Sequence, residues 1–333
     1  MMTQANKNKA CFCRFRKPTI SEPKKKDLEK QGYRIVGEHS AIKVCLWSKK
    51  SLREQGMCYK QKFYGINSHR CVQMTPSLPF CTLRCTWCWR DIEYTLPKWI
   101  GKKDNPKEII KGCIREHTKL LQGFGGNEKT SKKKYSESQK PMHFAISLAG
   151  EPTLYPELPE LLKELRRQKI SSFLVTNGTS PEMLEKLKKN SPTQLYITLP
   201  APNEEEFRKD CSPLIKDAWK KILESLEIMK QLKKKTRTTI RLTVAKKVNM
   251  VDPEGYAELI KIAEPMFLEV KAYMHVGYSK QRLEYEHMPL HEEIKDFAQQ
   301  IAKYTGYKIV DEQPISRVIL LMKKDRKDRK LKF

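Results

Sequence analysis

The sequence predicts an α/β protein whose central unit is a partial (β/α)6 barrel of the TIM type. From residue 142 onward, short apolar segments of strand length alternate with amphipathic helical segments, and one more strand precedes them. Repeated βα units place parallel strands side by side with helices outside. Six strands would make an incomplete barrel, and a doubly wound sheet is the alternative fold. The predicted strands are 71–78, 143–148, 172–176, 194–199, 239–245 and 267–273.

Composition indicates the kind of partner. The 333-residue chain has 66 Lys and Arg against 39 Asp and Glu, a net charge of +27. This excess indicates a polyanion, and nucleic acid is preferred over an anionic membrane surface; a lysine-rich thermophilic surface is the alternative. The chain shows neither a membrane-spanning apolar run nor an apolar signal core. We therefore expect a cytoplasmic protein, away from membranes, whose ten cysteines stay reduced.

Two extensions are expected around the barrel. Residues 1–68 form an N-terminal extension, 69–288 the core, and 289–333 a C-terminal helix, strand and basic tail. Residues 1–30 are polar without a sustained period, and Cys11 and Cys13 within them are interpreted as non-ligands. The segment 33–36 is predicted as a short strand, whereas 41–45 fits either part of a strand or a helix start.

Helices are predicted from apolar residues at helical spacing. Pro106 after Asn105 marks a helix start, and Cys113 and His117 lie on the apolar stripe behind it, so both are interpreted as core residues. The polar segment 123–140 is predicted to be a mobile loop. Further helices are predicted at 157–168, 181–189, 215–233, 253–262 and 289–304, and a final strand at 316–322.

The densest chemical signal is Cys81-Thr-Leu-Arg-Cys85-Thr-Trp-Cys88, after the first barrel strand. Thiolates at these spacings can converge on one soft metal centre from a single loop. Structural zinc usually takes four ligands, and the expected second half of a zinc site is missing. Three cysteines suit an iron–sulfur cluster with one iron free to bind a small molecule.

A second cysteine group precedes this loop. Cys45, Cys58 and Cys71 are each separated from the next by twelve residues, and Lys60 follows Cys58 by two positions. Three evenly spaced cysteines ahead of a cluster loop suggest a second metal centre, although a single one of them would be an ordinary buried residue.

Polar residues also mark the ends of predicted strands, where barrel enzymes carry their active residues. Gly150-Glu151-Pro152 follows the second strand and Thr176-Asn177-Gly178 the third. Each alone would read as a polar turn, but their order after a cluster loop predicts a site. Further candidates near later strand ends are Thr198, Arg241, Asn249 and Lys271.

The cysteine loop, with Trp87 before its third cysteine, resembles the signature of the radical S-adenosylmethionine (SAM) superfamily, whose incomplete barrel matches the predicted fold. The resemblance implies that Cys81, Cys85 and Cys88 hold a [4Fe–4S] cluster. SAM would bind the free iron and be cleaved to a 5′-deoxyadenosyl radical. Gly150 and Glu151 match a motif that contacts the methionyl amine, with Ala149 in place of a frequent glycine. Thr176 and Asn177 resemble the segment that touches the methionyl or ribose part.

The two cysteine groups, the Cys88-Trp-Arg90 run and the segments 147–155 and 269–273 resemble the archaeal tRNA 4-demethylwyosine synthases, from about residue 33 onward. This resemblance implies a carbon–carbon lyase of wybutosine biosynthesis. Its substrates would be pyruvate and the N1-methylguanosine at position 37 of phenylalanine tRNA, and its product 4-demethylwyosine. It also implies a second [4Fe–4S] cluster on Cys45, Cys58 and Cys71. Lys60 would form an imine with pyruvate, and ligation of pyruvate by the second cluster is the alternative.

The same resemblance indicates the partners. The target base must leave its stack, and Trp89 and Tyr273 are candidates to stack on it. Eukaryotic relatives carry an added flavodoxin-like domain for which this chain is too short. We therefore expect a monomer with a separate electron donor of the flavodoxin or ferredoxin type. The alternative function is another radical SAM enzyme of RNA modification, a methylase or methylthiotransferase; a non-enzymatic RNA-binding protein with structural metal is more distant.

Overall fold

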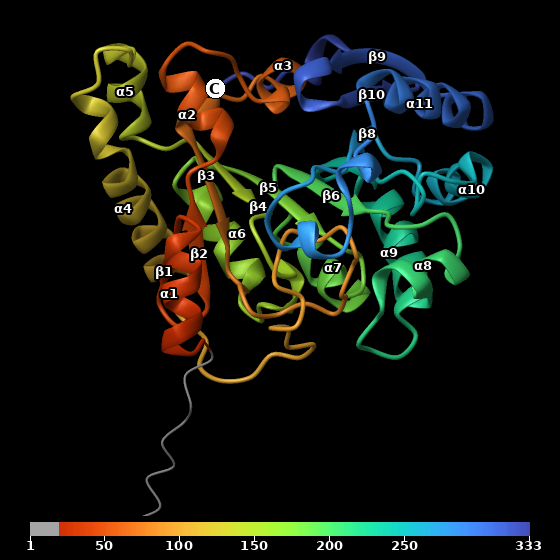
Figure 1. Cartoon of the computed structure of the whole chain (residues 1–333), viewed down its shortest axis with the longest axis horizontal. Coiled ribbons are helices and arrows are strands. Elements are labelled where there is room, and N and C mark those ends of the chain that lie inside the picture. The colour runs from red at the N-terminus through yellow and green to blue at the C-terminus, as the bar shows by residue number, and fades with distance from the viewer. Residues whose placement is uncertain (1–19) are drawn as a thin grey trace, which may run out of the picture.

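Six parallel strands form the centre of the protein in the computed structural model, which describes residues 20–333 (Figure 1). Each strand pairs with the next one along the chain, whereas a doubly wound sheet reverses its order at a switch point. The partial barrel is therefore confirmed and the alternative fold is excluded. The strands are β3 (Cys71–Thr75), β4 (His143–Ile146), β5 (Ser171–Thr176), β6 (Gln194–Thr198), β7 (Arg237–Val244) and β8 (Phe267–Ala272).

Antiparallel strands extend this sheet at both edges. On one side β2 (Ser40–Lys43) pairs with β3 and β1 (Tyr33–Val36) pairs with β2. On the other side β10 (Val318–Met322) pairs with β8, and β9 (Lys308–Gln313) pairs with β10. The described parts of both extensions thus belong to the same sheet as the core.

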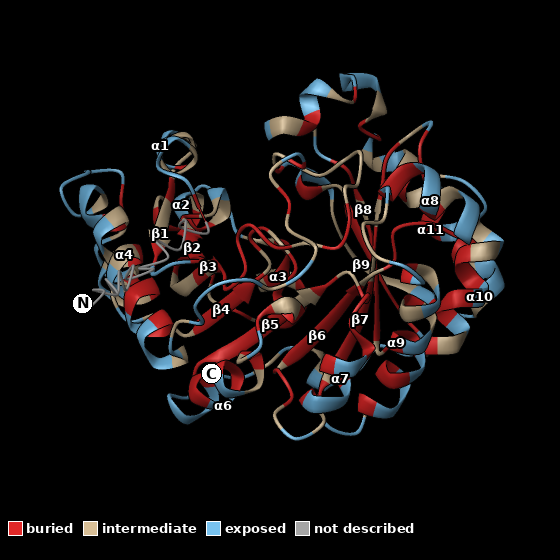
Figure 2. Ribbon diagram, turned by 90° about the horizontal axis from the view of Figure 1, so that it is seen from below, coloured by how far each residue is buried: buried red, intermediate tan, exposed pale blue. Residues whose placement is uncertain are grey.

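Helices cover the outer face of the curved sheet, as Figure 2 shows for α6, α7, α9 and α10. The apolar core lies between these helices and the strands, where Leu174 packs with Leu161 and Leu226. Because strand side chains alternate, Phe173 points to the inner side instead. The helices of this layer are α4 (Pro106–Gly125), α6 (Leu158–Arg167), α7 (Pro181–Leu187), α8 (Glu204–Cys211), α9 (Ala218–Leu232), α10 (Pro253–Ala263) and α11 (His291–Thr305).

Shorter helices come from the N-terminal part and the connection after α4. They are α1 (Glu22–Lys30), α2 (Leu46–Leu52), α3 (Tyr59–Tyr64) and α5 (Lys132–Ser138). Helix α3 lies beside β9 (Figure 1) and packs against the inner side of the barrel. Its apolar residues Tyr59, Phe63 and Tyr64 share an inner core with Phe173, Tyr196 and Phe267. This placement brings Lys60 inside the barrel.

The prediction of a mobile loop at 123–140 is wrong. Helix α4 continues to Gly125, and α5 occupies residues 132–138. The Ser131 amide donates to the Leu52 carbonyl at 2.9 Å, and the Glu137 carboxylate lies 2.7 Å from the His69 ring. These partners are distant in the sequence, so the polar composition of the segment did not reveal them.

Residues 20–30 and the basic end of the chain are more structured than their composition indicates. Residues 22–30 form α1. At the other end, the Leu331 amide donates to the Tyr64 carbonyl at 2.8 Å, and Arg329 pairs with Asp311 at 3.0 Å. Cys11 and Cys13 lie outside the described residues. Within residues 20–333, no helix has the length and apolar character needed to cross a membrane.

Candidate active site

Glu151 is the centre of a polar cluster at the carboxyl ends of β4 and β5. Its buried carboxylate accepts hydrogen bonds from the Thr153 amide (3.0 Å) and from the hydroxyls of Thr153 and Thr176 (both 2.6 Å). It also accepts from the Asn177 amide at 2.7 Å. Burial raises the pKa of Glu151, and the four donors oppose this effect. Predicted site residues from two strand ends therefore meet at one carboxylate.

Gly150 allows this cluster to approach the cysteine loop. Its φ is +68°, and a Cβ atom there would lie 2.0 Å from the Ser77 carbonyl oxygen and 2.7 Å from that of Phe80. The neighbouring Glu151 amide donates to the Phe80 carbonyl at 2.6 Å. Only glycine fits this contact, because any side chain would collide with backbone that cannot move away. Glu151 is thus held against the segment that leads into Cys81.

Asn177 joins the strand ends to the loop itself. Its side-chain amide donates to the Thr82 hydroxyl at 2.9 Å and lies 3.8 Å from the Cys81 sulfur. From the far side, Arg282 donates to the carbonyl oxygens of Thr86 (3.1 Å) and Cys88. The loop is therefore fixed by side chains on both sides, and Arg282 is a contributor that sequence reasoning missed.

We call Cys81, Cys85 and Cys88 the loop cysteines, and their surroundings fit an anionic iron–sulfur cluster. All three are partly exposed, whereas Cys113 and Cys211 are buried in the core. Arg90 is buried beside them, and its Nη1 atom has no hydrogen-bond partner among the described residues. Burial alone would lower the pKa of Arg90, but the loop cysteines reverse this and raise it. Burial raises the pKa of Cys81 to about 12, and the Arg90 guanidinium opposes this shift, which favours the thiolate form that binds iron.

Cys211, at the end of α8, is a neighbour that the sequence did not indicate. A hydrogen bond between the Cys85 and Cys211 thiols, together with burial, raises the pKa of Cys85. The Arg84 amide also donates to the Cys211 carbonyl at 2.9 Å. Helix α8 was not predicted, so nothing in the sequence pattern placed this cysteine near the loop.

We call Cys45, Cys58 and Cys71 the second cysteine group. Cys45 and Cys58 precede α2 and α3 directly, and Cys71 begins β3. Burial raises the pKa of Cys71 to about 12; Lys60 counteracts this, while the nearby thiols of Cys58 and Cys45 add to it. Three residues far apart in sequence are therefore neighbours in space, with an amine beside them.

Each cysteine group offers three thiols, and cysteine thiolates are the usual protein ligands of iron–sulfur clusters. Within residues 20–333, no set of three or more His, Cys, Asp or Glu side chains converges closely enough to hold one metal ion.

Lys60 points its amine at two aromatic faces inside the barrel. The Nζ atom lies 5.2 Å from the centre of the Phe173 ring and 4.9 Å from that of Tyr196. No described side chain or carbonyl accepts a hydrogen bond from this nitrogen. Burial and the positive charge of Arg241 lower the pKa of Lys60, which increases the neutral fraction of its amine. The environment is therefore suited to a nucleophilic amine.

A buried ion-pair network holds α3 in place. The Glu269 carboxylate accepts from Arg241 Nε at 2.9 Å and from the hydroxyls of Tyr64 (2.6 Å) and Tyr59 (3.3 Å). Arg241 also donates to the Tyr59 hydroxyl at 2.8 Å. The glutamate is fully buried, so its charge depends on these partners for compensation. Sequence reasoning named Arg241 as a candidate but missed the network, because Tyr59 and Tyr64 lie about two hundred residues from Glu269.

Lys60 and the Glu151 cluster lie at different heights of the barrel. Lys60 packs on Phe173, and Thr176 at the Glu151 cluster lies three residues further along β5. At a rise of roughly 3.3 Å per residue, the levels of Phe173 and Thr176 are about 10 Å apart.

The candidate Asn249 stabilises a turn. Its side chain accepts a hydrogen bond from the Ala245 amide and donates to the carbonyl oxygens of Pro200 and Thr243.

Five further residues named from the sequence have clear environments. Lys271 donates to the Ser316 carbonyl at 3.0 Å, and burial together with Arg241 lowers its pKa to about 8. The Trp89 side chain is 39% exposed, whereas Tyr273 is buried, so only Trp89 offers a ring surface to a base. Cys113 and His117 are buried on α4, which confirms them as core residues.

Comparisons with known proteins agree with this geometry. The chain matches the radical SAM superfamily over residues 75–260 and the family of wyosine base formation over residues 262–323. It is 48% identical to the S-adenosyl-L-methionine-dependent tRNA 4-demethylwyosine synthase of Pyrococcus abyssi, over 92% of this chain and 91% of that protein.

Two solved structures share the fold over nearly the whole chain. A structure of TYW1 with a lysine–pyruvate adduct bound superposes with a TM-score of 0.84 at 38% identity, and covers 94% of this chain and 100% of that one. A crystal structure of archaeal TYW1 gives a TM-score of 0.76 at 35% identity, with the same coverage.

Proposed function

Since this chain belongs to the S-adenosyl-L-methionine-dependent tRNA 4-demethylwyosine synthases, we infer that it is a radical SAM enzyme of wyosine biosynthesis. The family implies SAM and a [4Fe–4S] cluster as cofactors. We propose that the reaction joins N1-methylguanosine in phenylalanine tRNA to pyruvate and yields 4-demethylwyosine.

The observation that carries the proposal is the meeting of the loop cysteines with Glu151 and Asn177. The loop cysteines would hold the cluster, which supplies the electron that cleaves SAM into a radical able to abstract hydrogen from a methyl group. Glu151 would receive the methionyl amine, because a buried carboxylate with a raised pKa gains from a cationic partner. Thr176 and Asn177 orient that carboxylate through their hydrogen bonds.

Lys60 is our candidate for pyruvate activation. A neutral amine adds to the ketone carbon of pyruvate and expels water, which leaves an imine. The lowered pKa of Lys60 supports this step, and no residue within 20–333 accepts a hydrogen bond from its Nζ atom. The second cysteine group would hold a further [4Fe–4S] cluster next to this amine.

The solved TYW1 structure with a lysine–pyruvate adduct supports the same chemistry in a relative. In this chain, borohydride reduction in the presence of pyruvate should add one pyruvate-derived mass to the peptide that contains Lys60. The Lys60→Met variant should form neither the adduct nor the tricyclic base.

Lys62→Met is the matched control, because Lys62 lies on the same helix but is 41% exposed and pairs with Asp311. It should trap pyruvate as the unchanged enzyme does. Normal yields of 4-demethylwyosine from Lys60→Met would refute the imine and make ligation of pyruvate by the second cluster the leading account.

A further inference from the structure

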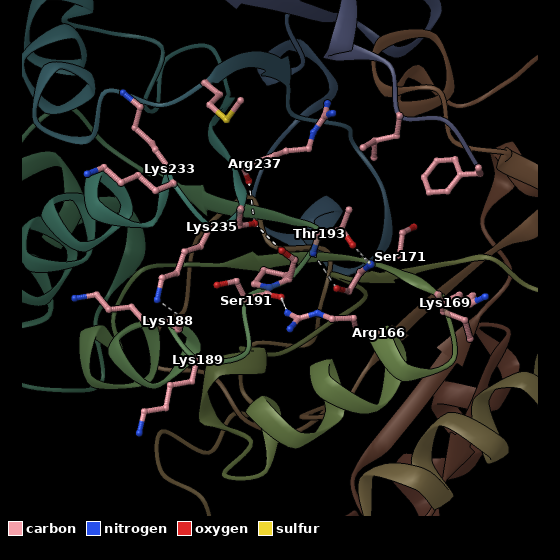
Figure 3. A pocket seen from close by; sticks show the side chains of 18 residues that line it. Arg166, Lys169, Ser171, Lys188, Lys189, Ser191, Thr193, Lys233, Lys235 and Arg237 are labelled. Carbon is pink, nitrogen blue, oxygen red and sulfur yellow. Dashed lines mark hydrogen bonds between the residues drawn. The ribbon is translucent and has the colours of Figure 1, made fainter.

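A hollow of about 830 Å³ opens at the amino ends of β5, β6 and β7 (Figure 3). The active-site residues Glu151 and Asn177 lie at the opposite, carboxyl edge of the same sheet. The hollow is lined by the connections that lead from α6, α7 and α9 into these strands, and by residues near the C-terminus. It takes no part in the chemistry described above.

The charged side chains that line this hollow are all basic. Of its eighteen lining residues eight are Lys or Arg, and none is Asp or Glu. Lys188 pairs with Glu185 and Lys233 with Glu264, but the other lysines have no carboxylate partner among the described residues. Eight cations held together repel one another, so an anionic ligand is stabilised here. The basic residues are Arg166, Lys169, Lys188, Lys189, Lys233, Lys234, Lys235 and Arg237.

The floor of the hollow is polar and fixed. Thr193 and Ser172 exchange two hydrogen bonds of 3.1 Å, each from a backbone amide to the other's hydroxyl. Above them the Arg237 guanidinium lies over the Phe267 ring at 4.8 Å and donates to the Arg329 carbonyl. Figure 3 shows the lysine side chains of the α7–β6 and α9–β7 connections extending around this floor. A rigid base with long cations at its rim suits phosphate groups, which lysine contacts as a point charge.

We propose that this hollow binds the sugar–phosphate backbone of the substrate tRNA, away from the base that is modified. The proposal rests on the proposed function, because it assigns a second contact to the same substrate. Strands of five to eight residues separate the hollow from the active edge by about 20 Å. Other RNA-binding domains contact about 16 base pairs of one RNA helix, which is longer than this separation. One tRNA molecule is therefore large enough to contact both places. The concave shape favours a narrow backbone over the broad face of an acidic protein.

The test compares two charge reversals of equal size. Lys189→Glu/Lys234→Glu changes the rim of the hollow, whereas Lys111→Glu/Lys303→Glu changes exposed lysines on α4 and α11. Binding of phenylalanine tRNA carrying N1-methylguanosine is measured by fluorescence anisotropy at several KCl concentrations. The hollow variant should bind at least about tenfold more weakly, and the slope of log Kd against log salt should fall by about 2. The control should stay within about threefold of the unchanged enzyme, since non-contacting charges act only through the screened field.

Lys189→Gln/Lys234→Gln is a milder second variant, since it removes charge without adding repulsion. The change in its log Kd for tRNA should be roughly half that of Lys189→Glu/Lys234→Glu. Equal binding by the hollow and control variants would overturn the proposal. If the hollow variant bound tRNA normally but was reduced more slowly by flavodoxin, the proposal would also fail, because that result assigns the hollow to an acidic electron donor. If the unchanged enzyme bound tRNA through these lysines but formed no 4-demethylwyosine, the docking proposal would stand and the proposed function would fail.

Discussion

Removing the Glu269 carboxylate tests whether the buried network holds α3, and with it Lys60. In Glu269→Ala the Arg241 guanidinium keeps its charge but loses the acceptor at 2.9 Å, and the Tyr64 hydroxyl loses its partner at 2.6 Å. Both groups stay buried, because Arg241 is only 13% exposed and Tyr64 is not exposed at all.

The expected cost follows from that geometry. Breaking a buried ion pair by removing one partner typically costs about 3–5 kcal/mol, because the remaining charge is left without compensation. The exposed pair between Lys247 and Glu286 gives the matched control, since its side chains are 68% and 62% exposed. Glu286→Ala should cost less than about 1 kcal/mol.

Urea unfolding of the cluster-free chain, followed by circular dichroism, measures both free energies. Glu269→Ala should also trap less pyruvate on Lys60, because Tyr59 and Tyr64 flank that residue on α3 and lose their anchor. Glu269→Gln keeps an acceptor oxygen without the charge. Its cost in free energy of unfolding should lie between those of Glu269→Ala and Glu286→Ala. A cost for Glu269→Ala as small as that of Glu286→Ala would refute the view that this network fixes α3.

Three further predictions concern the cysteines and the core. Changing all loop cysteines to Ala should remove one cluster, seen in iron content, and stop SAM cleavage. Changing all of the second cysteine group to Ala should leave one cluster and some uncoupled cleavage but no tricyclic base; unchanged iron would show that these cysteines are not ligands. Burial lowers the pKa of His117 to about 4, so the unfolded chain binds more protons between about pH 6.5 and 4. His117 should therefore contribute up to about 3 kcal/mol to the fall in stability as the pH drops through that window. His117→Leu should remove this contribution in urea titrations and leave that of His143, whose pKa burial lowers to about 3.

The strands of the barrel could be predicted because they are short apolar runs between turn residues. All six parallel strands appeared within a few residues of their predicted bounds. Strand β9 was missed because its residues are polar and only partly buried, and it exists through pairing with β10. Helix α5 was missed for a similar reason, since its contacts with His69 and Leu52 come from elsewhere in the chain.

The candidate site could be predicted only where chemistry leaves a local pattern. The loop cysteines and the strand-end residues Glu151 and Asn177 stand in short recognisable runs, and the structure brings them together. The contacts of Cys211 and Glu269 depend on the folded chain, because Cys211 lies on an unpredicted helix and Glu269 meets tyrosines about two hundred residues away.

The most direct test of the account is the product itself. Reconstituted enzyme is incubated with dithionite, SAM, ¹³C-labelled pyruvate and phenylalanine tRNA carrying N1-methylguanosine, and the nucleosides are analysed by mass spectrometry. The account predicts loss of N1-methylguanosine, release of 5′-deoxyadenosine and a tricyclic base that contains carbon from pyruvate. A methylated or methylthiolated nucleoside without pyruvate carbon would contradict it.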